Sequence, residues 1–309
     1  MTAIRANGIT LEYESLGPQD RPVVLLVMGL GMQLVAWPDA FCEGLVQRGF
    51  RVLRFDNRDC GLSQKLDELG TPRVPGMILR ALLGLPVRAP YDLTAMAADS
   101  VGLLDALGVQ QAHVVGASMG GMIGQLVAAL HPGRVLSLTS IMSTTGARHL
   151  PQPSARIRRE LLRRPQEPLT VDTLLAHYER LFAVIGSPGY PADPAEFRAR
   201  IRRGVERGYH PAGFLRQLAA ILATGDRSPL LGRITCPTLV IHGKADPLVP
   251  YQGGIDTAYK IRDARLVLLD GFGHDFPPAL LGRFADMIAR HATEAAPPPP
   301  PLQDSPAVA

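Results

Sequence analysis

The sequence predicts an α/β protein whose central sheet is mostly parallel and flanked by helices. Apolar strand-like runs alternate with helical patterns, as expected for parallel strands joined by right-handed crossovers. One run, residues 113–115, continues through Gly-x-Ser-x-Gly directly into an apolar helix. Helical periodicity alone covers residues 144–232. We therefore expect a core of residues 1–143 and 233–293, a helical cap of residues 144–232 inserted late in the sheet, and a disordered proline-rich tail of residues 294–309.

The first strands are predicted near the amino terminus. Residues 4–16 alternate apolar and polar side chains around Asn7-Gly8, which is typical of a β-hairpin. Residues 22–28 form a continuous apolar run, which suits a strand buried on both faces of a parallel sheet. The remaining core elements are expected in this order: a helix over residues 37–47, strand 50–56, helix 95–107, helix 122–130, strands 135–141, 237–243 and 264–269, and helix 276–291.

Ser118 is the centre of Gly116-Ala117-Ser118-Met119-Gly120, between the predicted strand and helix. This context is typical of a nucleophile elbow, where glycines flank the serine because the tight turn leaves no room for side chains. The serine then has a strained backbone and an exposed Oγ at the strand end. The alternative is a glycine-rich turn of a nucleotide-binding domain, but the spacing is not Gly-x-Gly-x-x-Gly and no phosphate-binding lysine follows.

A serine nucleophile needs a base within hydrogen-bond reach and a group that orients the base. His274 lies in a glycine-containing loop directly after a predicted strand, and Asp246 follows the strand before it. The order Ser118, Asp246, His274 is the order of triads built on a nucleophile elbow. We expect Asp246 to hold one tautomer of His274. Five other carboxylates compete for that role: Asp226, Asp256, Asp263, Asp270 and Asp275.

Acyl transfer also needs backbone amides that bind the oxyanion of the tetrahedral intermediate. One candidate is the N–H of Met119, which follows the nucleophile. The other is the N–H of Leu30, because Gly29 allows the chain to turn after the early strand. A plain turn at the end of that strand is the alternative for residues 28–31.

From about residue 4 to residue 291 the chain resembles the α/β-hydrolase fold, and within it the bacterial esterases related to aclacinomycin methylesterase. The motifs that carry this resemblance are Met28-Gly29, Trp37-Pro38, Asp56-x-Arg58-x-x-Gly61-x-Ser63, Gly116-x-Ser118-Met119-Gly120-Gly121, Asp246 and Gly273-His274-Asp275. The resemblance implies ester hydrolysis through an acyl-enzyme, with no metal and no diffusible cofactor. Many relatives have His-Gly where this chain has Met28-Gly29.

The expected function is hydrolysis of a small-molecule carboxylic ester, hydrophobic or small to medium in size. Met28, Met32 and Met142, together with Leu30 and Met119, would form a flexible apolar pocket wall. Residues 77–79 and 81–83 would add a lid, although both sets are equally compatible with ordinary core. The same triad also serves carbon–carbon bond hydrolases, perhydrolases, thioesterases and acyltransferases. A noncatalytic ligand receptor on the same fold is a further alternative.

Composition bounds the partners and the compartment. The net charge is +4, and residues 148–233 contain fifteen arginines against eight acidic side chains. These arginines are spread through predicted helices without interleaved aromatics, which favours a solvated helical face over nucleic-acid binding. Three cysteines, Cys42, Cys60 and Cys236, lack metal-ligand spacing and suit reduced thiols. With no signal segment and no long apolar run, we expect a cytoplasmic protein without stable membrane insertion, either monomer or homodimer.

Overall fold

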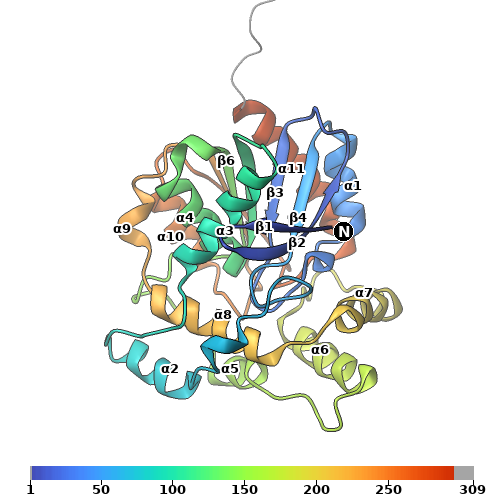
Figure 1. The fold of residues 1–309 in the computed structure, drawn as a ribbon, viewed down its shortest axis with the longest axis vertical. Helices are drawn as coiled ribbons and strands as arrows, with labels where there is room; N and C mark the ends of the chain where they lie inside the picture. Colours follow the sequence, from blue (N-terminus) through green and yellow to red (C-terminus); the bar gives the residue numbers. More distant parts are fainter. Residues whose placement is uncertain (1, 296–309) are drawn as a thin grey trace, which may run out of the picture.

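The structure, a computed structural model, describes residues 2–295. Within them the sheet has eight strands in the order β1-β2-β4-β3-β5-β6-β7-β8 (Figure 1). The strands are β1 (Thr2–Ala6), β2 (Ile9–Leu16), β3 (Val23–Val27), β4 (Arg51–Phe55), β5 (Ala112–Ala117), β6 (Val135–Ile141), β7 (Thr238–Gly243) and β8 (Arg265–Leu269). Pairing is antiparallel for β1–β2 and β2–β4 and parallel for the other pairs. The predicted α/β class with a mostly parallel sheet is confirmed.

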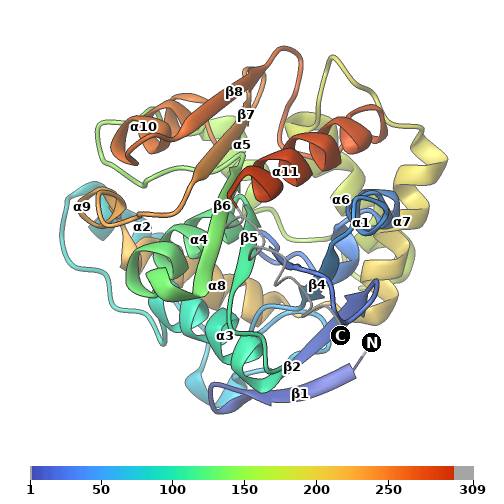
Figure 2. The ribbon, with the colours of Figure 1, turned by 90° about the horizontal axis from the view of Figure 1, so that it is seen from above.

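Helices cover both faces of this sheet. The α-helices are α1 (Asp39–Gln47), α2 (Val74–Leu82), α3 (Leu93–Ala106), α4 (Met119–Leu130), α5 (Ala155–Leu161), α6 (Val171–Ile185), α7 (Pro194–Arg207), α8 (Pro211–Thr224), α9 (Ser228–Leu231), α10 (Gln252–Lys260) and α11 (Leu281–Ala295). Short 3₁₀ turns are η1 (Leu34–Ala36), η2 (Asp67–Leu69), η3 (Pro132–Arg134) and η4 (Pro278–Leu280). In Figure 2, α1 and α11 lie on one face and α3 and α4 on the other. None of the helices within residues 2–295 has both the length and the apolar character needed to span a bilayer.

The sequence pattern explains the centre of the sheet. Every residue of β3, β5 and β7 is buried, as the continuous apolar runs predict. The amino-terminal hairpin turns at Asn7 and Gly8, whose φ angles are 47° and 79°. Both residues therefore have the left-handed conformation that a tight hairpin turn of this length requires.

The largest differences from the predicted boundaries are at the two ends of the last helix. The last helix begins at Leu281 instead of residue 276, because Pro277 and Pro278 lack the N–H groups of an α-helical turn and restrict the residues before them. It continues to Ala295, so residues 294–295 are helical and do not belong to a tail. The rest of the predicted proline-rich tail, residues 296–309, lies outside the described residues.

Residues 144–232 form α5 to α9 and, within the described chain, contain no strand. In Figure 1, α5, α6, α7 and α8 lie together with α2 at one edge of the sheet. The short helix α9 instead packs against α4 and α10 on a face of the sheet. The edge occupied by α5 to α8 is the carboxyl edge of the parallel strands, since Ser118 after β5 and residues of these helices line one cavity. Ligands of parallel α/β sheets bind at this edge.

Candidate active site

Ser118 occupies the turn between β5 and α4 in a backbone conformation that residues other than glycine rarely adopt. Its φ and ψ are 55° and −119°, and such left-handed conformations of non-glycine residues are strained. A Cβ on Gly120 would lie 1.9 Å from the carbonyl oxygen of Val27, and one on Gly116 would lie 2.1 Å from that of Gly120. The turn therefore requires glycine at both flanking positions. The Ser118 hydroxyl does not cap α4, so it is available to other partners.

The structure brings Ser118, His274 and Asp246 together from three loops. His274 Nε2 lies 3.0 Å from Ser118 Oγ, and His274 Nδ1 lies 2.7 Å from Asp246 Oδ2. Asp246 Oδ1 accepts hydrogen bonds from the backbone N–H groups of Leu248 (2.9 Å) and Val249 (2.8 Å). The carboxylate thus has one oxygen fixed by the backbone and one turned toward the imidazole.

The charge state of Asp246 follows from its surroundings. Burial by itself raises the pKa of this carboxyl, but the opposing influence of His274 and His242 prevails and holds the pKa at about 2. His242 lies in the same buried layer, with Nε2 2.8 Å from the carbonyl oxygen of Val249 and 3.5 Å from Asp246 Oδ2. Asp246 is therefore ionised at neutral pH, as a group that orients an imidazole must be.

The loop that carries His274 is held by the end of α6. The His274 N–H donates to the carbonyl oxygen of Ile185 at 2.7 Å, and the Gly273 N–H donates to Ser187 Oγ at 2.9 Å. A Cβ on Gly273 would lie 2.3 Å from the carbonyl oxygen of Gly186, so this approach requires glycine. The inserted segment thus fixes the position of the imidazole.

The other carboxylates considered for the orienting role make different contacts. Asp275 accepts a hydrogen bond from Ser187, and burial raises its pKa. Asp256 accepts a hydrogen bond from Thr145, Asp270 pairs with Lys244, and Asp226 binds the N–H of Ser228. Asp256 lies inside α10, and Asp263 is exposed beyond that helix. Among the six carboxylates weighed from the sequence, Asp246 is the one within hydrogen-bond distance of the His274 ring.

The loop after β3 approaches the nucleophile closely. A Cβ on Gly29 would lie 3.2 Å from Ser118 Cβ. The Gly31 N–H donates to Gln217 Oε1 of α8 at 2.8 Å, whereas within residues 2–295 the Leu30 N–H has no hydrogen-bond acceptor. Met119 begins α4, and N–H groups in the first turn of a helix have no partner within that helix. In the part of the chain that the structure describes, neither amide predicted to bind an oxyanion has a hydrogen-bond acceptor.

Side chains from distant elements hold this loop. Asn57 Nδ2 donates to the carbonyl oxygen of Met28 at 2.9 Å, and Gln217 Nε2 donates to that of Arg58 at 2.7 Å. Asp56, fully buried after β4, accepts from the Leu34 N–H at 2.7 Å. These contacts connect the loop to the strand beside it and to α8.

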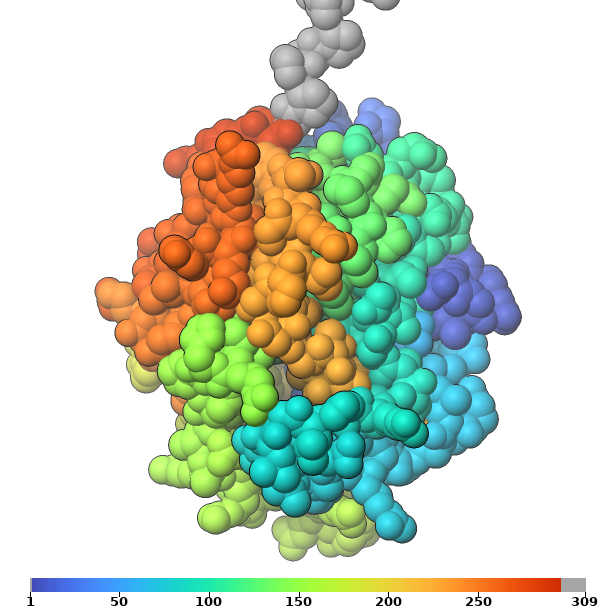
Figure 3. Space-filling model, turned by 90° about the vertical axis from the view of Figure 1, so that its left-hand side faces the viewer, coloured from blue at the N-terminus to red at the C-terminus, as the bar shows by residue number. Residues whose placement is uncertain are grey.

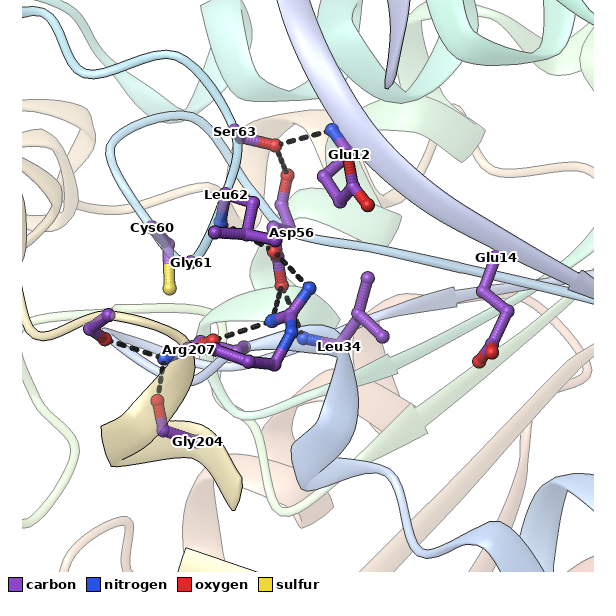
Figure 4. Close-up of polar contacts among 12 residues, drawn as sticks. Glu12, Glu14, Leu34, Asp56, Cys60, Gly61, Leu62, Ser63, Gly204 and Arg207 are labelled. Carbon is purple, nitrogen blue, oxygen red and sulfur yellow. Dashed lines mark hydrogen bonds and ion pairs between the residues drawn. The ribbon is translucent and has the colours of Figure 1, made fainter. Parts of the chain in front are cut away.

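Arg207 of α7 also holds the loop after β3, through contacts with Asp56 and Gln33 (Figure 4). Its Nη2 lies 3.0 Å from Asp56 Oδ2, and its Nη1 donates to Gln33 Oε1 at 2.5 Å. Gln33 Nε2 donates in turn to the carbonyl oxygens of Gly204 and Gly208 at the end of α7. We refer to Asp56, Arg207 and Gln33 as the α7 clamp. Sequence reasoning missed the clamp and Gln217, because the paired residues are more than 150 positions apart along the chain and no local pattern marks them.

Breaking the clamp is expected to destabilise the protein. Arg207→Met leaves the Asp56 carboxylate buried without its cation, which typically lowers the free energy of unfolding by about 3 kcal/mol. Arg203→Met is the matched control on the same helix: its partner Asp39 is 2.7 Å away, but both side chains are nearly half exposed, and such pairs contribute less than about 1 kcal/mol. Urea unfolding measures both variants, and equal losses would contradict the assignment.

Two arginines of the inserted segment are buried, so the prediction of a solvated helical face does not hold for them. Arg216 of α8 is fully buried and pairs with Asp59 at 2.7 Å and Asp67 at 2.8 Å. Arg227 donates to the carbonyl oxygen of Thr144 at 2.7 Å, and burial lowers its pKa to about 10. Arginine forms such buried pairs because its planar head donates several hydrogen bonds at once, and composition alone does not reveal which arginines find partners.

Ser118 and His274 open into a cavity of about 1800 Å³ between the sheet edge and α2, α5, α6, α7 and α8. Met28, Leu30, Met32 and Met142, the residues expected to form a pocket wall, lie at this cavity. The Met119 side chain does not: it is fully buried in the core under α4, and Met122, one helical turn further on, reaches the cavity instead. Of the predicted lid residues, Ile78, Ala81 and Leu82 line the cavity.

The fold and this site define an α/β hydrolase. A family model described as the alpha/beta hydrolase fold matches residues 22–277, so the chain belongs to this family of hydrolases. The predicted resemblance is thereby confirmed.

Among individual relatives, rhodomycin D methylesterase DnrP of Streptomyces peucetius is 31% identical, covering 94% of this chain and 98% of DnrP. The putative carbamate hydrolase RutD of Stutzerimonas stutzeri is also 31% identical, covering 92% of this chain and 97% of its own. The crystal structure of an enol-lactonase from Burkholderia xenovorans LB400 has a similar fold, with a TM-score of 0.72 at 22% identity over 94% of this chain and all of that one.

Proposed function

We propose that this protein is a carboxylic-ester hydrolase that acts through a serine acyl-enzyme. The observation that carries the proposal is the hydrogen-bonded series Ser118, His274 and Asp246, with distances of 3.0 Å and 2.7 Å, at the wall of a large cavity. An ionised carboxylate, an imidazole and a hydroxyl in this arrangement are the groups that acyl transfer requires. The methylesterase relatives support the same reaction.

The proposed mechanism uses groups of this chain and water. Ser118 Oγ attacks the ester carbonyl while His274 Nε2 takes its proton, and Asp246 stabilises the resulting imidazolium. The N–H groups of Leu30 and Met119 bind the oxyanion of the tetrahedral intermediate. His274 then protonates the departing alcohol. A water molecule, activated by the same imidazole, releases the acid from Ser118.

The cavity supports a hydrophobic substrate. Methionine and leucine side chains surround the approach to Ser118, and flexible methionines adapt to apolar ligands of different shapes. A volume of about 1800 Å³ leaves room for a bulky acyl group beside a small alcohol. Because two relatives are methylesterases, we propose methyl esters of hydrophobic carboxylic acids as the preferred class.

The test is hydrolysis of p-nitrophenyl esters of increasing acyl length, together with methyl esters of aromatic acids. We expect kcat/KM to rise about fourfold for each added methylene until the apolar wall is filled, because burying one methylene contributes about 0.8 kcal/mol. Preference for charged esters would contradict the substrate class. If the folded protein cleaves no ester but hydrolyses a carbon–carbon bond in a vinylogous diketone, the proposed reaction is wrong.

A further inference from the structure

Exposed leucines surround the mouth of the active-site cavity. At the end of α2, Leu79 and Leu82 and the capping residue Leu83 have spacings of three and four residues, so they share one helix face, and each is more than half exposed. The full set of exposed leucines on α2 and the segments beside it is Leu79, Leu82, Leu83, Leu85, Leu162 and Leu169. We call this set the leucine rim. An apolar group of this kind, raised on a helix and bordered by charge, marks an interaction surface.

The two chain segments that carry the leucine rim have a large excess of positive charge. Residues 70–91 contain three arginines and no acidic side chain, and residues 144–169 contain six arginines and two glutamates. One of these glutamates, Glu160, pairs with Arg163. All nine arginines are exposed: Arg73, Arg80, Arg88, Arg148, Arg156, Arg158, Arg159, Arg163 and Arg164. These segments therefore combine exposed apolar side chains with many exposed positive charges.

The leucine rim belongs to the entrance of the cavity. Arg148 Nη2 lies 3.4 Å from the carbonyl oxygen of Leu82, so the segment before α5 lies against the end of α2. Leu82, Leu85 and Leu162 also line the cavity that contains Ser118. Figure 3 shows a hollow in the surface where three parts of the chain meet: α2, α8 and the segment that precedes α5. A partner bound to the rim would face the route to the nucleophile.

We propose that the leucine rim docks reversibly on the surface of an anionic lipid bilayer. The leucines would enter the boundary between headgroups and acyl chains, and the arginines would bind lipid phosphates, as basic amphipathic helices do. With nine residues α2 is far too short to cross a bilayer, so contact is peripheral. The cavity mouth then faces the lipid phase, from which a hydrophobic ester can enter without crossing water.

The charge favours lipid over a second copy of the chain. Two rims facing each other would bring two sets of exposed arginines together, and like charges at an interface oppose association. An acidic protein would match the charge but would offer no apolar phase to the open mouth of a cavity lined by leucine and methionine. The experiment must therefore distinguish lipid binding from binding of a second copy of the chain and from binding of an acidic protein.

Vesicle co-sedimentation tests the proposal with the Ser118→Ala protein, so that the result does not depend on the proposed hydrolysis. We expect binding to phosphatidylcholine vesicles containing about 30 mol% phosphatidylglycerol to be at least about tenfold stronger than to pure phosphatidylcholine. Raising NaCl from about 50 to about 500 mM should abolish the difference, because salt screens surface charge. Equal binding to both vesicles, or none to either, would overturn the proposal.

Variants locate the contact. Leu79 and Leu83 do not line the cavity, and we expect Leu79→Ser/Leu83→Ser to reduce vesicle binding about tenfold through lost apolar burial. Arg80→Glu/Arg88→Glu should reduce it by a similar or larger factor. The matched controls Ile255→Ser and Arg262→Glu change exposed residues on and after α10 and should bind like the parent.

Other outcomes would overturn the docking proposal. Binding that survives both rim variants places the contact elsewhere. A dimer by light scattering that the rim variants convert to monomer assigns the rim to a second copy of the chain. Tight binding of a polyglutamate peptide that competes with vesicles at low salt and persists at high salt assigns it to an acidic protein. Circular dichroism verifies that each variant is folded.

Discussion

Replacing Ser118 with alanine is expected to lower kcat for ester hydrolysis at least about a thousandfold. The substitution removes the hydroxyl that lies 3.0 Å from His274 Nε2, and no acyl-enzyme can form without it. The strained turn already holds the backbone at φ 55°, so alanine occupies the same position. KM should change far less than kcat, since the residues lining the cavity remain in place.

Ser140→Ala is the matched control for this experiment. Ser140 on β6 is also buried, and within residues 2–295 its hydroxyl has no hydrogen-bond partner, so its loss should leave kcat within about twofold of the parent. A fluorophosphonate probe should label the parent at Ser118 and should not label the Ser118→Ala protein. Mass spectrometry detects the labelled residue. Undiminished turnover in folded Ser118→Ala would rule out the serine mechanism.

Asp246→Asn should reduce kcat by about a thousandfold or more, as the loss of the orienting carboxylate does in comparable triads. The two backbone N–H groups of Leu248 and Val249 bind Oδ1, so an asparagine at this position keeps its oxygen there. Its NH₂ group must then point at His274 Nδ1 and donate a hydrogen bond to it. The imidazole is forced into the tautomer that carries hydrogen on Nε2, which cannot take a proton from Ser118.

Asp275→Asn separates this effect from the loss of any nearby charge. Asp275 adjoins His274 in the chain, but it binds Ser187, so we expect a loss in kcat of less than about tenfold for this variant. Comparable losses in kcat for Asp246→Asn and Asp275→Asn would show that the orienting role was assigned to the wrong carboxylate. The comparison uses the same ester and the same pH for both variants.

Much of this architecture was predictable because local patterns determine it. The strand, glycine turn and helix around Ser118 are contiguous in sequence, and the loops that carry Asp246 and His274 each follow a strand. Carboxyl ends of parallel strands meet at one sheet edge, so sequence position alone was enough to predict that these side chains converge. The hairpin at Asn7 was predictable because its turn and both strands are contiguous in the sequence.

Contacts between distant segments were not predictable in this way. Helical periodicity identifies which side of α7 is apolar, but it does not indicate that Arg207 pairs with Asp56 across 151 positions. The direction of the Met119 side chain was misjudged because Met119 is the first residue of α4 and its side chain packs into the hydrophobic core. Helix α2 was not predicted, because its nine residues are too few for a long apolar pattern and include Gly76, a poor helix former.

The support of the loop after β3 bears on how substrate specificity can change in this family. Gln217 and Arg207 belong to the helical segment inserted between β6 and β7, yet they bind the loop that carries Leu30. The helices that would select the substrate and the backbone that would stabilise its transition state are therefore not independent modules. Transplanting helices from a relative would alter the rate of chemistry as well as the choice of ester, unless the new segment also supplies an amide in place of Gln217 and a guanidinium in place of Arg207.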